Sequence, residues 1–347
     1  MKKYVSLILA VLMTVSLFAG CASDKAVETT AAPETTVAPE TTVPETTAAP
    51  EELPNLMVMS GPTGVGAAKL MADQEIAAEK VIASASVVAD NEAVKNALIS
   101  GDTDIAAVAT NMAATLANKT EGGITVLTIN TMGVLYILEK GETVQTMADL
   151  EGKTVYATGQ GANPEYILNY LLTQNGVEPT DVDIQWLTAQ EVVAKMTTEE
   201  AAICMLPVPA ATTVMMKDAS VRQAISLSEV WDSLGNGALA QGCIVARTEY
   251  VQQNPNAVTA FLEAYEQSIA YMNEEANRED AAALVAQYEI TANAQIAAKA
   301  IPQCNLTFVT GADMKAILES FYDVLYQANP ASIGGAMPDA AFYYGAE

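Results

Sequence analysis

Residues 105–129 read IAAVATNMAATLANKTEGGITVLTI, and this stretch contains a complete strand, helix and strand in succession. The apolar run 105–108 has the length of a buried strand, and the apolar residues of 112–118 recur at helical spacing. After two glycines, 124–129 is rich in β-branched residues and predicts a second strand. Because a helix that joins two such strands crosses over the sheet, the stretch predicts an α/β layer with parallel strands.

The same alternation continues in both directions from this unit. Before it, strands are predicted at 56–59 and 80–86, and helices at 65–78 and 91–100. A second series begins near Gly133, with strands at 134–138, 154–157, 183–187, 202–206 and 242–246, and helices at 164–175, 191–196 and 209–216. The tail is predicted helical at 255–277, 279–287 and 311–327. The sequence therefore predicts two α/β lobes, each a mostly parallel sheet flanked by helices, with a helical C-terminal segment.

Composition restricts the possible functions before any motif is considered. The 347 residues allow two domains, and with 51% hydrophobic and 17% charged residues the chain can bury a sizeable core. A formal net charge of −26 opposes binding to nucleic-acid phosphates, so no nucleic-acid partner is expected, and it favours a soluble monomer. The chain contains no histidine, which removes the commonest general base and every imidazole metal ligand.

The N-terminus is typical of an export signal, which we place at residues 1–20. Lys2 and Lys3 precede the uncharged apolar run 4–18, and small residues stand directly before Cys21. The run is short for a helix that must cross about 30 Å of hydrocarbon, so a permanent transmembrane anchor is the weaker interpretation.

The end of this signal contains the sequence Phe18-Ala19-Gly20-Cys21, which resembles a bacterial lipobox, although Leu17 lies one place earlier than the usual leucine. The resemblance implies that the signal is cut before Cys21 and that the Cys21 thiol is lipidated. Two acyl chains would then hold the protein at the outer face of the cell membrane. The alternative is an ordinary cleaved signal followed by an incidental cysteine.

Residues 21–53 are predicted to be the lipidated cysteine and a disordered tether. The stretch 26–54 repeats a short unit of proline, glutamate, threonine and alanine, as in 32–36 and 43–47, and has almost nothing apolar to bury. Proline stiffens such a chain and the glutamates repel one another, so we expect an extended, semi-rigid spacer. A long spacer after a lipid anchor favours a Gram-positive cell, where a thick wall surrounds the membrane.

The candidate site is formed by the loops that follow the predicted strands, because ligands of open α/β sheets bind beyond the carboxyl ends of the strands. These loops are 61–66, 110–112, 130–132, 159–164 and 207–209, and none contains a charged residue. From them, and from the segment before the strand at 242–246, we take the following as candidate ligand-binding residues: Thr63, Gly64, Thr110, Asn111, Thr131, Gln160, Gly161, Ala162, Asn163, Pro207 and Gln241.

Loop 159–164 comes closest to a nucleotide-binding motif, since Gly159 and Gly161 follow a strand and precede a helix. Pro164 stands where a dinucleotide fingerprint needs a third glycine, so that fingerprint is rejected. Loop 61–66 lacks the lysine of a P-loop. Two interpretations of 159–164 stay open. It is an ordinary turn with Asn163 as N-cap and Pro164 as the first helical residue, or its backbone N–H groups contact an anionic or polar ligand.

The sequence predicts no catalytic residue, no metal site and no cofactor. It has no GxSxG elbow and no informative carboxylate pair, and its three arginines lie outside the candidate loops. A zinc site would need closely spaced cysteine pairs, which the chain lacks. Besides Cys21, three cysteines stand in the chain and are interpreted as core thiols, with a disulfide between any two left open: Cys204, Cys243 and Cys304.

Two further motifs carry a family resemblance that covers roughly residues 54–328. Residues 148–155, ADLEGKTV, resemble the "DLKGK-strand" segment of type II periplasmic binding proteins. Residues 254–258, NPNAV, resemble the "ENPEAV" segment of the sulfonate, nitrate and thiamine-pyrimidine binding branch, the SsuA/TauA and NMT1/THI5-like group. Leu206 stands where many relatives have an acidic residue before proline, which leaves the ligand class open.

The resemblance implies a two-lobed clamshell whose chain crosses between lobes near 130–134 and 240–244. Lobe 1 would combine 54–133 with 244–347, lobe 2 would be 134–243, and ligand would lie in the cleft between them. We expect an extracytoplasmic solute-binding lipoprotein that delivers a small molecule to the permease of an ABC importer. The alternatives are a ligand-sensing or adhesion lipoprotein that presents to a membrane receptor, and an enzyme on the same fold.

Overall fold

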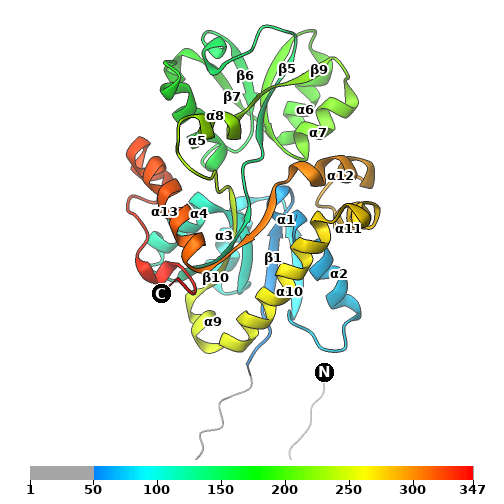
Figure 1. Ribbon diagram of the computed structural model, residues 1–347, viewed down its shortest axis with the longest axis vertical. Helices are drawn as coiled ribbons and strands as arrows, with labels where there is room; N and C mark the ends of the chain where they lie inside the picture. Colours follow the sequence, from blue (N-terminus) through cyan, green and yellow to red (C-terminus); the bar gives the residue numbers. More distant parts are fainter. Residues whose placement is uncertain (1–50, 347) are drawn as a thin grey trace, which may run out of the picture. The chain divides into compact units, whose positions relative to one another are not determined.

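Two β-sheets organise residues 51–346, the part of the chain that the computed structural model describes (Figure 1). The strands of the first sheet, in spatial order, are β11 (Leu306–Val309), β4 (Ile124–Thr131), β10 (Gly242–Arg247), β3 (Ile105–Ala109), β1 (Asn55–Met59) and β2 (Ser84–Val88). Those of the second are β7 (Asp183–Trp186), β6 (Thr154–Ala157), β8 (Ala202–Pro207), β5 (Leu135–Lys140) and β9 (Val221–Ser226). We call each sheet with its helices a lobe.

Helices flank both sheets. Those of the first lobe are α1 (Pro62–Val65), α2 (Ala68–Ile76), α3 (Asn91–Ser100), α4 (Thr110–Lys119), α9 (Thr248–Gln253), α10 (Pro255–Asn273), α11 (Arg278–Gln287), α12 (Ala294–Ala300) and α13 (Gly311–Ala328). Those of the second are α5 (Asn163–Gln174), α6 (Ala189–Thr198), α7 (Ala210–Lys217) and α8 (Leu227–Ser233). Short 3₁₀ turns complete the chain at η1 (Met147–Leu150), η2 (Pro179–Asp181), η3 (Glu275–Asn277), η4 (Ile301–Gln303), η5 (Pro330–Ile333) and η6 (Ala340–Phe342). Over residues 51–346, every helix is too short or too polar to span a bilayer.

The prediction of two α/β lobes is confirmed, but the sheets are mixed and not mostly parallel. In the first sheet β1 pairs parallel with β2 and β3, whereas β10 runs antiparallel to β3 and β4. In the second, β6 pairs parallel with β7 and β8, whereas β5 runs antiparallel to β8 and β9. The chain leaves the first sheet after β4, enters the second as β5 and returns as β10 (Figure 1). β10 enters the first sheet at the edge where β3 and β4 end, and β5 enters the second sheet at the edge where β8 and β9 end. Each therefore runs antiparallel to those neighbours.

Several elements differ from their predicted positions. β2 begins at Ser84 and not at residue 80, and β11 lies between two predicted helices, in the stretch 288–310 where no element was predicted. β11 has only four residues and pairs only with β4 among the residues described, so its extended conformation depends on a tertiary contact. Short strands of this kind carry too little periodicity to be recognised from sequence.

The hydrophobic core continues from one lobe to the other. One buried cluster joins Val108 and Ile129 of the first sheet to Ile137 of the second. A second cluster packs the other face of the first sheet against α2 and α10, and Val208 of the second lobe is part of it. The prediction of core thiols is confirmed, since three cysteines are free and buried: Cys204, Cys243 and Cys304.

Candidate functional site

The structure brings several of the predicted ligand-binding residues into one buried hydrogen-bonded group, which we call the junction group. Its members are Thr110, Asn111 and Thr131 of the first lobe, Asn163 of the second, and Gln241 in the segment that leads from α8 back to β10. Thr110 and Thr131 are 0% exposed, Asn163 1% and Asn111 2%. Buried polar groups of this kind need hydrogen-bond partners, so their contacts decide what the site can do.

Asn111 and Asn163 form a reciprocal pair at the N-termini of α4 and α5. The backbone N–H of Asn163 donates to Asn111 Oδ1 at 3.1 Å, and the backbone N–H of Asn111 donates to Asn163 Oδ1 at 3.3 Å. Asn163 Nδ2 also donates to Thr110 Oγ1 at 2.8 Å and to the carbonyl of Gln241 at 2.9 Å. The Asn163 side chain therefore joins the second lobe to the first.

Gln241 ties together the two segments that connect the lobes. Its backbone N–H donates to the Thr131 carbonyl at 3.0 Å, and its Oε1 accepts from the backbone N–H of Val134 at 2.5 Å. Its carbonyl also accepts from the Thr110 N–H at 3.3 Å. Both connections are thus fixed beside the Asn111–Asn163 pair.

Thr63 and Gly64 lie in α1, next to the junction group. The Thr63 carbonyl accepts from Asn130 Nδ2 at 2.9 Å, and the same nitrogen donates to the hydroxyl of Tyr265 at 2.9 Å. Burial raises the pKa of Tyr265 well above its usual value, so the hydroxyl keeps its proton. Gly242 allows this approach, because a Cβ there would lie 2.4 Å from Thr63 Cγ2 and 2.7 Å from Asn130 Oδ1.

Sequence reasoning missed Tyr265, and it placed Asn130 in a candidate loop without selecting it as a ligand-binding residue. Asn130 stands directly before Thr131 at the end of β4, and this position was a usable signal. Tyr265 lies on α10, far along the chain, and only the packing of α10 against the first sheet brings it here.

Loop 159–164 differs from the prediction at the start of α5. The helix N-cap is Ala162, and Asn163 makes no capping hydrogen bond because its side chain is used in the lobe junction. Gly159 has φ 91°, and a Cβ there would lie 2.5 Å from the Pro164 ring, so glycine is required. The Gly161 N–H donates to the Glu165 carboxylate at 2.6 Å. The Gly161 N–H, which one of the two open interpretations assigned to a ligand, therefore has an anionic partner from its own helix.

The remaining predicted residues lie outside the junction group. Gln160 and Gly161 are exposed on the second lobe, and Ala162 is buried beside Asn163. Pro207 ends β8, where it pairs in register with Leu135. Cys21 lies outside the described residues.

Amides, hydroxyls and backbone groups make up the whole junction group, with no charged side chain among its members. In this structure these groups bond to one another, and the junction group contains no nucleophile with an adjacent base. Within residues 51–346, no cluster of three acidic or cysteine side chains could hold a metal ion.

A family model and several solved structures are similar to this chain. The NMT1/THI5-like family model matches residues 84–279, more than half of the chain. The structure is similar to an ABC transporter protein from Parabacteroides distasonis, with a TM-score of 0.70 and 23% identity over 84% of this chain and 98% of that one. It is also similar to the periplasmic aliphatic sulphonate binding protein SsuA from Escherichia coli, with a TM-score of 0.66 and 18% identity over 85% and 99%. The periplasmic nitrate-binding protein NrtA from Synechocystis PCC 6803 aligns with a TM-score of 0.53 and 17% identity over 69% and 66%. A comparison with curated proteins gives no match.

Proposed function

The chain belongs to the NMT1/THI5-like family, and from that premise we propose that it is an extracytoplasmic solute-binding protein of an ABC importer. It captures a small molecule between its lobes and presents it, as a monomer, to the permease. The observation that carries the proposal is the junction group, in which uncharged polar residues from both lobes meet at the strand ends. A solute that bridges such groups stabilises the closed form, as hinge closure around a ligand requires.

The chemistry of the site restricts the solute. The predicted ligand-binding residues offer hydroxyl, amide and backbone groups and include no arginine or lysine. An uncharged, zwitterionic or aromatic solute fits these groups, as does a small anion held by N–H donors. Sulfonates and nitrate are the solutes named for two of the similar structures, and thiamine-pyrimidine-like compounds are the third candidate class.

Thermal unfolding against a solute panel tests the proposal. The panel contains sulfonates, nitrate, pyrimidines, vitamins, amino acids and nucleosides, and a true ligand at 100 times its dissociation constant adds about 2.7 kcal/mol to the free energy of unfolding. The same incubations, analysed for products, test the proposal that the protein binds its solute without converting it. A solute whose stabilising effect disappears in Asn111→Ala and Asn163→Ala supports the site, and turnover of any solute contradicts the binding role.

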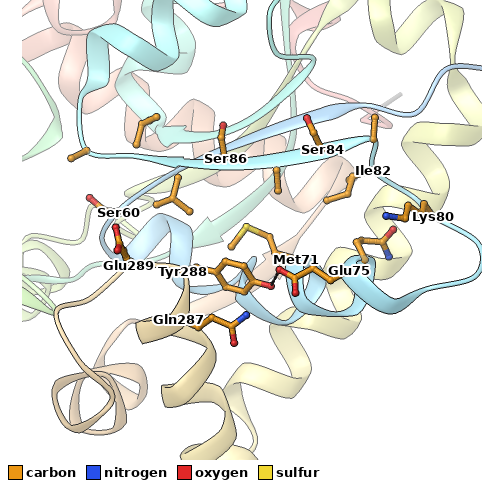
Figure 2. A pocket seen from close by; sticks show the side chains of 16 residues that line it. Ser60, Met71, Glu75, Lys80, Ile82, Ser84, Ser86, Gln287, Tyr288 and Glu289 are labelled. Atoms are coloured by element: carbon orange, nitrogen blue, oxygen red, sulfur yellow. Dashed lines mark hydrogen bonds between the residues drawn. The ribbon is translucent and has the colours of Figure 1, made fainter.

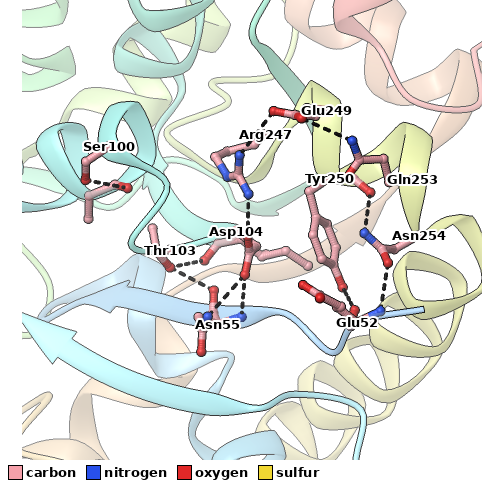
Figure 3. Close-up of polar contacts among 12 residues, drawn as sticks. Glu52, Asn55, Ser100, Thr103, Asp104, Arg247, Glu249, Tyr250, Gln253 and Asn254 are labelled. Carbon is pink, nitrogen blue, oxygen red and sulfur yellow. Dashed lines mark hydrogen bonds and ion pairs between the residues drawn. The ribbon is translucent and has the colours of Figure 1, made fainter. Parts of the chain in front are cut away.

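We also propose that Cys21 is lipidated and that residues 21–53 tether the body to the outer face of the membrane. Residues 51 and 52, at the start of the described chain, are held against the first lobe (Figure 3). The Glu51 carboxylate accepts from the Ala257 N–H at 2.7 Å, the Glu52 N–H donates to Asn254 Oδ1 at 2.8 Å, and the Tyr250 hydroxyl donates to the Glu52 carbonyl at 2.6 Å. These contacts lie at the end of the first lobe where β1 begins, whereas the junction group lies where β3 and β4 end.

The anchor is tested by cell fractionation. In the natural host, the wild-type protein should stay with membranes, and Cys21→Ala should remove the acyl chains, which mass spectrometry of the N-terminal peptide detects. A Cys304→Ala variant is the matched control, because that buried thiol lies in the folded body. Equal membrane retention of Cys21→Ala and wild type would rule out lipidation as the anchor.

A further inference from the structure

A groove of about 540 Å³ lies on the first lobe, apart from the junction group (Figure 2). Its walls are β2 with the residues just before and after it, the second half of α2, and the segment 287–289 at the end of α11. None of the predicted ligand-binding residues lines this groove. Its size is typical of ligand pockets, and the solute-binding proposal does not use it.

One wall of the groove is an open sheet edge. β2 is the last strand of the first sheet and pairs with β1 through one edge, while its other edge has no strand partner within residues 51–346. Ser84, Ala85 and Ser86 are exposed, and the strand reads SASVV, without proline, charge or bulky side chains. Exposed edge strands normally carry such features to prevent pairing with another chain. β2 therefore offers about 16 Å of free backbone to an incoming strand.

The opposite wall is acidic. Glu75 and Glu289 are both exposed, and the Tyr288 hydroxyl donates to Glu75 Oε1 at 2.7 Å (Figure 2). Lys80 is the one cationic side chain among the residues that line the groove. Together with the net charge of −26, these carboxylates favour a positively charged occupant.

We propose that the groove binds an extended peptide segment of a partner protein, which adds a strand to the free edge of β2. The main-chain hydrogen bonds with β2 supply affinity, and a lysine or arginine side chain of the peptide faces the Glu75 or the Glu289 carboxylate and supplies selectivity. The small side chains of Ser84, Ala85 and Ser86 let the peptide backbone approach closely.

Defined synthetic peptides test this proposal on the purified protein. Three nonapeptides share one alternating valine–threonine sequence and differ at the central residue, which is lysine, norleucine or glutamate. A fluorescent label reports binding by anisotropy up to about 1 mM peptide, and hydrogen exchange by mass spectrometry locates it. The expected result is the order lysine, norleucine, glutamate in affinity, with slower exchange confined to the segment around 80–89. Absence of binding by all three, or equal affinity of the lysine and glutamate peptides, overturns the proposal.

Two sets of variants test the backbone pairing at β2 and the acidic side chains independently. Glu75→Gln with Glu289→Gln should weaken the lysine peptide about fivefold and leave the norleucine peptide unchanged, whereas the matched control Glu178→Gln with Glu200→Gln, two exposed residues of the second lobe, should change neither. Alternate amides of a strand point to opposite edges, so one of Ala85→Pro and Ser86→Pro removes an amide that faces the open edge. That variant should keep its melting temperature and bind no peptide. If every proline variant that folds normally also binds the peptide fully, pairing at β2 is refuted. If neither variant folds, the charge variants decide the question.

Discussion

Replacing Asn163 with alanine is expected to open the protein. The side chain makes three hydrogen bonds to the first lobe and to the segment that enters it: from Nδ2 to Thr110 Oγ1 at 2.8 Å, from Nδ2 to the Gln241 carbonyl at 2.9 Å, and to Oδ1 from the Asn111 N–H at 3.3 Å. At about 1 kcal/mol each, their loss shifts the equilibrium between closed and open forms by about 3 kcal/mol. This is roughly a hundredfold in the ratio of closed to open molecules.

Trp231 provides the optical readout of this change. It lies on α8 of the second lobe, is 0% exposed, and its ring centroid is 5.3 Å from that of Tyr170 and 5.5 Å from that of Phe321 on α13 of the first lobe. Its Nε1 has no hydrogen-bond partner among residues 51–346, so separation of the lobes gives the indole its first contact with water. A Trp186→Phe background leaves Trp231 as the only tryptophan.

In that background, Asn163→Ala should shift the tryptophan emission to longer wavelength and increase the radius of gyration in X-ray scattering. Asn118→Ala is the matched control, because Asn118 Nδ2 donates to the carbonyls of Ile333 and Ala336 within the first lobe. This control should lose stability without either change. If Asn163→Ala kept both the emission maximum and the radius while its free energy of unfolding fell by the full 3 kcal/mol, these contacts would persist in every folded state, and the reasoning would be refuted.

Three further predictions follow from single residues. Desolvation acts to raise the pKa of buried Glu139. Hydrogen bonds from neighbouring N–H and hydroxyl groups, together with an adjacent guanidinium, outweigh it, so the net pKa is lowered. The ionised carboxylate therefore stabilises the fold above about pH 4.3, and this effect is lost as the pH falls through the lowered pKa. In urea unfolding, Glu139→Gln should lower the free energy of unfolding by about 1–3 kcal/mol at pH 7 and by less at pH 3. Burial raises the pKa of Cys304 to about 12, and mass spectrometry should find no iodoacetamide adduct on Cys204, Cys243 or Cys304 at pH 8 until guanidinium unfolds the chain and exposes these three thiols. Gly242→Ala should destabilise the fold by about 1–3 kcal/mol through its clash with Thr63 Cγ2, and adding Thr63→Ala should restore part of the melting temperature. A double variant as unstable as Gly242→Ala alone would show that the clash with Thr63 is not the cause.

Local pattern was sufficient for most elements of the fold. The helix α3 was predicted at its observed bounds, and β6 likewise, because apolar spacing and clear turn residues mark both ends of each. The direction of β10 and the existence of β11 were not predictable in this way. Both depend on which strand lies beside them, and periodicity carries no information about a neighbour that is far along the chain.

The same division applies to the candidate site. The position of Asn163 after a strand and before a helix marked it as a site residue, and the rule that ligands lie beyond strand ends also selected Thr110. The sequence could not reveal that the Asn163 side chain bonds to the other lobe and leaves its own helix uncapped. It also could not place Tyr265 beside Asn130.

The sequence by itself determined the α/β class, the alternation of strands and helices, and the uncharged loops at the strand ends, because these follow from local periodicity and residue type. Only the tertiary structure decided the mixed strand order, the closure of the junction group across the lobes, and the open edge of β2 beside an acidic groove. These features depend on contacts between residues that are distant in the chain. Their free energies come from packing and hydrogen bonds that exist only once the two sheets are assembled.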